Sequence, residues 1–364
     1  MYTSFDFFII SGRGGMPIKA ILDGEEIHSF TFNEREWEEL KDSYKKRTLV
    51  MSCCGHGAIP KTSKLNNFHF SHKPKSDCQY ARESPDHLYL KFLIAKLAHK
   101  AGWSVTTEKS GQTPTGEQWI ADVYCTKNNV QLIFEVQLSQ QSMDVFKERQ
   151  AKYIASGINR VLWLHKLRKG KEFYFRDICI SYDLPMFGLL QDENNNYYLP
   201  QFSVSVDQFI TGVLEKKLTW HPHNNSKLQA KVIPYKEECW RCGKETNIVR
   251  GIGIHSLDNI ALDFISFGNQ DCKDLIHKHI SNEVLKSHGI GELKQRYSKT
   301  AGGFYLSNGC KYCNALLGDF YLPNSPLEYR SNKYKSIATF TFDYRGSPFI
   351  NQNWYFQGLR AKRI

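Results

Sequence analysis

Residues 119–138 read Trp-Ile-Ala-Asp-Val-Tyr-Cys-Thr-Lys-Asn-Asn-Val-Gln-Leu-Ile-Phe-Glu-Val-Gln-Leu, which is two apolar runs joined by a polar turn. β-branched and aromatic residues dominate both runs, and this composition predicts strands over 119–125 and 130–138. The Lys127-Asn128-Asn129 segment between them is typical of a tight turn. The stretch therefore predicts a β-hairpin at the centre of the fold.

Each predicted strand contains one acidic residue, Asp122 in the first and Glu135 in the second. Because side chains alternate along a strand, Glu135 and Gln137 share one face. If the hairpin places Asp122 beside Glu135, the two carboxylates repel unless a cation lies between them, and such oxygen ligands suit Mg²⁺ or Mn²⁺. The alternative is that each carboxylate forms an ion pair with a Lys or Arg at the sheet edge.

The flanking sequence predicts the rest of this domain. Ser84-Pro85-Asp86 offers an N-cap, a helix-starting proline and an acidic first turn, so we expect a helix that ends at Gly102. Further strands are expected over 103–107 and 160–164, with a second helix over 142–156. This order predicts an α/β (α+β) fold, a mixed sheet flanked by helices.

Titratable residues gather at the start of the first predicted helix. Glu83 precedes the N-cap, and His87 and Lys91 are spaced i, i+4 at the border of the apolar stripe. We expect this cluster to face the two strand carboxylates. The alternative for His87 is a partly buried histidine with ordinary hydrogen-bond partners.

Two Cys-x-x-Cys pairs lie far apart in the C-terminal part of the chain, Cys239/Cys242 and Cys310/Cys313. Four thiolates in two such pairs match a closed, tetrahedral Zn²⁺ site. The sequence therefore predicts a structural zinc site, which holds a C-terminal domain together and leaves no open position for chemistry.

A second group of cysteines and histidines lies near the N-terminus. Cys53, His56, His72 and Cys78 form our candidate set for a second Zn²⁺, with Cys54 as an alternative ligand. An equally weighted alternative is that the histidines only pack and hydrogen-bond within a small β-rich region.

The chain has 364 residues, with 48 Lys and Arg against 37 Asp and Glu, a net charge of +11. This charge favours a polyanionic partner. No apolar run approaches the length of a membrane span, and no secretion signal is recognisable, so we expect a cytoplasmic protein. We expect an N-terminal β-rich region over 1–80, a core over 81–220, and a zinc-binding domain over 226–364.

One series of short motifs resembles a known family. Asp122-Val123 precedes Glu135-Val136-Gln137-Leu138-Ser139, with Glu83-Ser84-x-x-His87-x-x-x-Lys91 before it and Arg149-x-x-x-Tyr153 after it. Phe68-His69-Phe70-Ser71-His72 matches a further His-Phe-x-His element. Over residues 45–170 this order is similar to the CoiA-like competence nucleases of the PD-(D/E)xK superfamily.

The resemblance implies a Mg²⁺-dependent phosphodiesterase site. It implies that Asp122 and Glu135 bind the metal, that His87 or Glu83 completes the ligand set, and that Arg149 and Tyr153 are candidates to contact phosphate, with structural packing as the alternative for Tyr153. Gln137 departs from the superfamily, because it stands where a lysine usually supplies positive charge. Lys91 or Arg149 could supply that charge instead.

The leading hypothesis from the sequence is a metal-dependent DNA endonuclease in bacterial DNA processing or anti-phage defence. Its expected partner is DNA, and double-strand cutting by one site per chain favours a homodimer or a partner protein. The alternative is a non-catalytic nucleic-acid-binding accessory protein that grips DNA in a degenerate nuclease pocket, consistent with Gln137.

Overall fold

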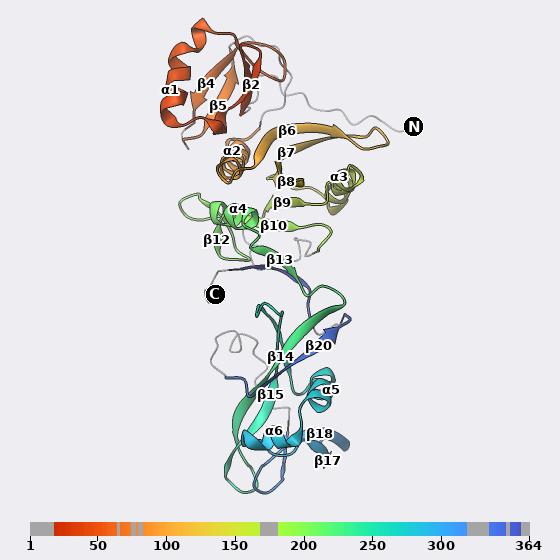
Figure 1. The fold of residues 1–364 in the computed structure, drawn as a ribbon. Coiled ribbons are helices and arrows are strands. Elements are labelled where there is room, and N and C mark those ends of the chain that lie inside the picture. Colours follow the sequence, from red (N-terminus) through yellow and green to blue (C-terminus); the bar gives the residue numbers. More distant parts are fainter. Residues whose placement is uncertain are drawn as a thin grey trace, which may run out of the picture. The chain divides into compact units, whose positions relative to one another are not determined.

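The computed structural model of the protein describes residues 18–63, 66–73, 78, 83–167, 181–318, 335–346 and 350–357. The chain divides into two compact units, with the boundary after Leu218, and the second unit ends at Gln357. Each unit is described by itself (Figure 1). The domain limits expected from the sequence stay predictions, because compactness alone does not define folding domains.

A seven-stranded mixed sheet forms the centre of the first unit, in the order β12-β11-β10-β9-β8-β7-β6. Its strands are β6 (Ser104–Gln112), β7 (Gln118–Lys127), β8 (Val130–Gln137), β9 (Val161–Lys166), β10 (Met186–Gln191), β11 (Tyr197–Leu199) and β12 (Val204–Ser205). The strands β8, β9 and β10 run parallel, and the outer pairs are antiparallel. The predicted mixed sheet is confirmed, although β6 runs further than the expected 103–107 because its partly exposed second half pairs with β7.

Three helices cover this sheet, with α2 and α4 on one face and α3 on the other (Figure 1). They are α2 (Pro85–Lys100), α3 (Met143–Ala155) and α4 (Val206–Leu214). The Ser84 hydroxyl accepts the backbone N–H of His87 and so caps α2, as predicted. The chain leaves α2 through Gly102, whose φ of +76° favours glycine.

The N-terminal region packs against α2 through aromatic side chains. Trp37 stacks on Phe68 at 4.8 Å between ring centroids, and Phe68 meets Phe92 of α2 edge to face at 6.2 Å. The region consists of β1 (Lys19–Leu22), β2 (Glu25–His28), η1 (Ser29–Thr31), α1 (Glu34–Ser43), η2 (Tyr44–Lys46), β3 (Leu49–Val50), β4 (Ala58–Thr62) and β5 (Phe68–His72). It therefore has apolar packing of its own, independent of any metal.

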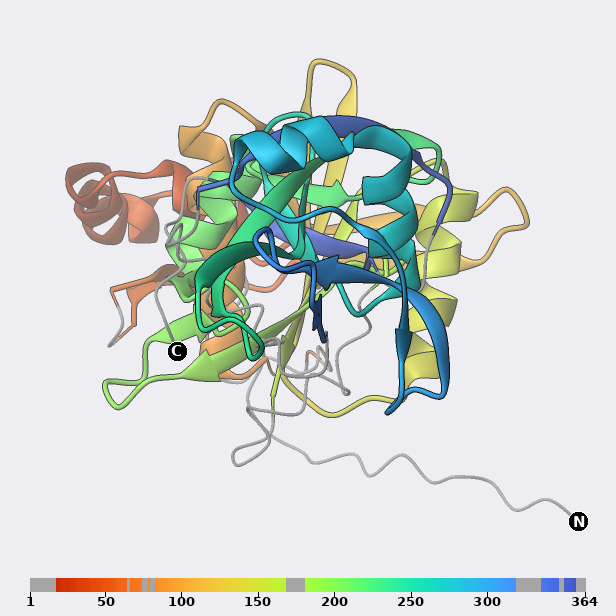
Figure 2. The same cartoon turned by 90° about the horizontal axis from the view of Figure 1, so that it is seen from below.

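The second unit is built on the long hairpin of β14 and β15. The chain here contains β13 (Leu218–His221), β14 (Ser226–Glu238), β15 (Glu245–His255), β16 (Ala261–Ser266), α5 (Gln270–His279), α6 (Asn282–Ser287), β17 (Lys294–Ser298), β18 (Gly303–Gly309), β19 (Leu316–Leu317), β20 (Ala338–Tyr344) and β21 (Asn353–Phe356). One core joins apolar residues of β14 and β15 to Ile276 of α5 and Leu285 of α6. Figure 2 shows α5 and α6, in cyan, alongside the curved green strands.

One buried side chain joins the β18 strand to β15. The Asn308 amide donates to the carbonyl oxygen of Val249 at 3.0 Å and accepts its backbone N–H at 2.9 Å. Asn308 thus acts towards Val249 as a neighbouring strand would.

Among the helices that the structure describes, none combines the length and apolarity needed to cross a membrane.

Candidate active site and metal centres

The first cluster forms where α2 meets β7 and β8. His87, in the first turn of α2, places Nε2 at 2.9 Å from the carbonyl oxygen of Val136 and 3.4 Å from Oδ2 of Asp122. Its Nδ1 lies 3.5 Å from Oε2 of Glu83. Side-chain atoms of Glu83, His87 and Asp122 that could bind a metal all lie within 4.8 Å of one another. The structure therefore brings these three predicted residues together.

Charge pairing sets the protonation of this cluster. Burial opposes the charged form of His87, but the carboxylates of Asp122 and Glu83 outweigh it and raise its pKa to about 10. Burial likewise opposes ionised Asp122, yet His87, Lys91 and the backbone N–H of Val136, which donates at 2.8 Å, lower its pKa to about 2. Asp122 is therefore an anion at neutral pH.

Glu135 lies at the middle of β8 and is fully buried. Its carboxylate accepts hydrogen bonds from Tyr153 and from Arg149, whose Nη2 is 2.6 Å from Oε2. Burial, reinforced by repulsion from Asp122, raises the pKa of Glu135 to about 8 even though Arg149 opposes the shift. Glu135 therefore lies close enough to Asp122 to respond to its charge. It also contacts a basic side chain, Arg149, as expected from the alternative to metal binding in which each carboxylate pairs with a Lys or Arg.

Gln137 follows on the same face of β8. Its amide nitrogen donates to the carbonyl and hydroxyl oxygens of Ser139, and its oxygen lies 3.5 Å from Nη1 of Arg149. Arg149 also lies over the Trp163 ring, 4.8 Å from the centroid. The cation beside Gln137 is therefore Arg149, one of the two that the sequence offered for this role.

Lys91 has a different role from the one the sequence offered. Its side chain is fully buried, and Nζ contacts Oε1 of Glu83 at 2.5 Å and Oε1 of Glu108 at 2.8 Å. Burial opposes the charge, but Glu108 and Glu83 raise the pKa of Lys91. Lys91 thus holds Glu83 beside His87 and is not the cation next to Gln137.

Glu108 is the residue of this site that the sequence interpretation missed. Its neighbours Thr107 and Lys109 pair with Val123 and Ala121, which sets Glu108 opposite Asp122. Its φ of +52° interrupts the regular strand. The only signal in the sequence was an acidic residue directly after the strand expected over 103–107.

The C-terminal cluster gathers Cys239, Cys242, Cys310 and Cys313. The Sγ atoms of Cys239 and Cys313 are 3.5 Å apart, and those of Cys242 and Cys310 are 3.7 Å apart. Four sulfurs at about 2.3 Å from one Zn²⁺ in a tetrahedron lie about 3.8 Å from each other. The donor set therefore fits zinc.

The two C-terminal Cys-x-x-Cys turns share one backbone geometry. In the first, the N–H of Cys239 donates to Lys244 and the N–H of Gly243 donates to Cys239. In the second, the N–H of Cys310 donates to Ala315 and that of Asn314 to Cys310. Gly243 and Asn314 both have positive φ, +67° and +59°. We call this arrangement the knuckle turn.

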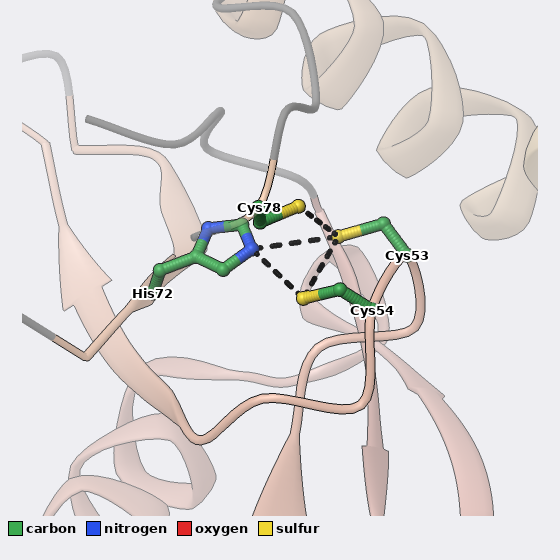
Figure 3. A group of neighbouring side chains, drawn as sticks. All are labelled: Cys53, Cys54, His72 and Cys78. Carbon is green, nitrogen blue, oxygen red and sulfur yellow. Dashed lines mark hydrogen bonds between the residues drawn. The ribbon is translucent and has the colours of Figure 1, made fainter. Parts of the chain in front are cut away.

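The N-terminal cluster consists of Cys53, Cys54, His72 and Cys78 (Figure 3). Cys53 Sγ lies 3.8 Å from the sulfurs of Cys54 and of Cys78, and His72 Nε2 lies 3.5 and 3.3 Å from Cys53 and Cys54. These spacings also fit tetrahedral zinc. His56, a residue of our candidate set, lies outside the cluster and is exposed, and Cys54 stands in its place.

The backbone around Cys54 explains this exchange. The N–H of Met51 donates to His56, the N–H of Gly55 donates to Met51, and Gly55 has a φ of +70°. This is the knuckle turn again, so Cys54 corresponds to Cys242 and Met51 to Cys239. His56 contributes its carbonyl oxygen to the turn, and Cys53 contributes the sulfur that Met51, at the first position of the turn, does not provide.

Comparison with known families agrees with this geometry. Residues 83–241 match the family described as "Competence protein CoiA, nuclease-like domain". The match begins at Glu83 and includes all the residues of the carboxylate site named above. No curated protein matches the chain.

Proposed function

Residues 83–241 belong to the CoiA nuclease-like family, and from that premise we propose that the protein is a Mg²⁺- or Mn²⁺-dependent DNA endonuclease. The observation that carries the proposal is the convergence of Glu83, His87 and Asp122 beside the buried carboxylate of Glu135. Four titratable groups at one point of a sheet are costly to the fold unless they serve a ligand.

Each residue of the carboxylate site has a distinct proposed role. Asp122 and Glu135 are the proposed metal ligands, and the set is completed by Glu83, or by His87 once the cation displaces the proton that Asp122 and Glu83 stabilise on it. A bound divalent cation would polarise the scissile phosphate and acidify a water molecule. Tyr153 and Arg149 fix the orientation of Glu135, and Arg149 also provides positive charge next to Gln137. Lys91 keeps Glu83 in place through an ion pair.

A second function is favoured by one observation. Gln137 lacks the charge of the usual lysine, and the nearest cation, Arg149, is paired with Glu135. A protein with this arrangement could bind DNA without cutting it. We therefore keep a non-catalytic DNA-binding accessory protein as the alternative.

The test uses supercoiled circular DNA with and without Mg²⁺ or Mn²⁺. Wild type should nick or linearise the circle only with the metal, and Asp122→Asn and Glu135→Gln should each lower the rate at least about 100-fold. Glu148→Gln is the matched control, because its side chain is exposed on the same helix, next to Arg149. The Glu148→Gln rate should equal that of wild type.

Other outcomes are equally informative. Cleavage that survives Glu135→Gln would disprove the assigned site. A wild type that retards DNA on a gel but never cuts it, with either metal, would favour the accessory protein.

We extend the proposal to the two cysteine clusters, as structural Zn²⁺ sites, and to the biological setting. The net charge of +11 supports a nucleic-acid substrate.

The biological setting would be bacterial DNA processing or anti-phage defence. Assays of DNA uptake and of phage plating on a strain that carries Glu135→Gln separate the two. A homodimer would allow two sites to cut both strands, and light scattering of the DNA complex tests it.

A further inference from the structure

The two knuckle turns of the second unit carry the same pair of residue types between their cysteines. Cys239 and Cys242 enclose Trp240 and Arg241, while Cys310 and Cys313 enclose Lys311 and Tyr312. Each turn thus holds one aromatic and one basic residue. The Trp240 residue is 68% exposed and Tyr312 is 52% exposed, although large aromatic residues usually bury most of their surface.

Contacts between the turns make these residues one surface. Trp240 Nε1 donates to the carbonyl oxygen of Leu316, beyond the second knuckle, at 2.8 Å. Lys244, from the first turn, places Nζ 4.9 Å from the ring centroid of Tyr312 in the second. Arg241 lies over Trp240 at 5.1 Å and Lys311 over Tyr312 at 4.9 Å. We call the five residues Trp240, Arg241, Lys244, Lys311 and Tyr312 the knuckle surface.

The cations of the knuckle surface are not committed to carboxylates. In the part of the chain that the structure describes, no ion pair joins Arg241, Lys244 or Lys311 to an acidic residue. The nearby Glu245, at the base of the hairpin, contacts Lys236 at 2.8 Å. These cations could help to neutralise the four thiolates, but that role does not require exposed aromatic rings.

Exposed aromatic rings beside cations are the combination that binds single-stranded nucleic acid. Unpaired bases stack on aromatic side chains, and Lys and Arg contact the phosphates. The bases of a duplex are already stacked on each other and offer no free face to such rings. The hydrogen bond of Trp240 fixes its indole, so little conformational entropy is lost on stacking.

We propose that the knuckle surface binds single-stranded DNA, with bases stacked on Trp240 and Tyr312 and phosphates on Arg241, Lys244 and Lys311. The choice of DNA rests on the proposed function, whereas the binding itself needs no cleavage. The surface belongs to the second unit, whereas the carboxylate cluster belongs to the first.

The experiment measures fluorescence anisotropy of a labelled oligothymidine and of a duplex of equal length. It uses the full-length protein without added Mg²⁺, so that binding is independent of cutting. Trp240→Ala and Tyr312→Ala should each weaken binding of the single strand about 10-fold and the duplex little. Trp240→Phe, which keeps a ring, should restore most of the affinity.

Phe304→Ala is the matched control, because Phe304 is a 73% exposed aromatic residue of the same unit that does not belong to the knuckle surface. It should leave the affinity unchanged. Zinc content is measured for every variant, so that loss of the fold is separated from loss of the rings.

Three results would overturn the proposal. The first is unchanged affinity of the zinc-loaded alanine variants, the second is a loss of duplex binding in these variants as large as their loss of single-strand binding, and the third is an equal loss on Phe304→Ala. Cleavage of circular DNA is measured on the same variants. A failed nuclease with intact binding, or the reverse, therefore tells the two proposals apart.

Discussion

The N-terminal and C-terminal cysteine clusters are built on the same turn, but they place different residues at its first position. Cys239 and Cys310 begin the C-terminal turns, whereas Met51 begins the N-terminal one and Cys53 supplies the missing sulfur from two residues later. The turn therefore forms with or without a cysteine at its first position, because its own backbone hydrogen bonds hold it.

Burial separates the two clusters further. Cys239 and Cys310 lie in the apolar core of their unit, while Cys53 is exposed. Burial and hydrogen bonds to Cys54 and Cys78 raise the pKa of the Cys53 thiol to about 12. Burial also opposes the Cys239 thiolate, but N–H groups of Cys242 and Arg241 lower its pKa to about 6. The first position of that turn therefore favours a thiolate. In the same cluster the N–H of Ala315 favours the Cys313 thiolate, but burial and hydrogen bonds to the other three cysteines outweigh it and raise the pKa of Cys313 to about 11.

The largest effect is expected from Cys310→Ser. This change removes a proposed zinc ligand from the core, so one of two zinc equivalents should be lost and the second unit should be destabilised by at least about 4 kcal/mol. Zinc analysis and limited proteolysis of residues 219–357 measure it. Cys272→Ser, a change at a buried thiol of the same unit outside the cluster, should keep both equivalents.

Acid should destabilise the second unit. Burial and repulsion from Lys231 lower the pKa of His255 to about 4, against about 6.5 in an unfolded chain. Between pH 6.5 and 4, His255 is therefore protonated in the unfolded state and neutral in the folded state. The free energy of unfolding of the second unit falls by up to about 3 kcal/mol as the pH is lowered through this range. Denaturation at several pH values, for wild type and His255→Gln, measures the effect. Identical slopes for both would contradict it.

Removing the N-terminal metal should cost less. Cys54→Ser should lose one zinc equivalent and about 2 kcal/mol or less, because Trp37 and Phe68 hold the region without the metal. The matched variant His56→Ala should keep both equivalents. Loss of zinc from His56→Ala, with retention in Cys54→Ser, would restore the ligand set expected from the sequence.

The smallest change in zinc content tests the correspondence between the turns directly. If Met51 occupies the position of Cys239, the double change Met51→Cys with Cys53→Ser should keep two zinc equivalents, while Cys53→Ser alone should lose one. Because Met51 is fully buried, its shortening to cysteine should itself cost about 1–3 kcal/mol, so zinc content is the deciding measurement. Equal zinc loss in both variants would show that the turns are not equivalent.

Local patterns predicted much of the first unit. The capping serine, the helix period and the alternating strands located α2, β7, β8, α3 and β9 within two residues at most ends. The sequence analysis predicted no strand where β10 to β12 lie, because these short segments lack a distinctive period. Parallel pairing of β8, β9 and β10 is a long-range property that local sequence does not encode.

The candidate site was predictable in its residues and less so in its pairings. Glu135 and Asp122 were visible as charges inside strands. The contacts of Lys91 were not, because they depend on Glu108 adopting a positive φ in the middle of β6. The exchange of His56 for Cys54 was hidden for a similar reason, since hydrogen bonds of Met51 and Gly55 decide which side chains converge.

The amide of Asn308 bears on the order in which the second unit assembles. It hydrogen-bonds both backbone groups of Val249 and lies two residues before Cys310. It therefore fixes the register of the second knuckle turn relative to β15. Only a side chain that donates and accepts at once can do this. The alignment of the four sulfurs is thereby set by an interaction between uncharged groups. The register of the second knuckle turn would therefore be set before zinc binds. Zinc would stabilise the assembled site and would not determine its register.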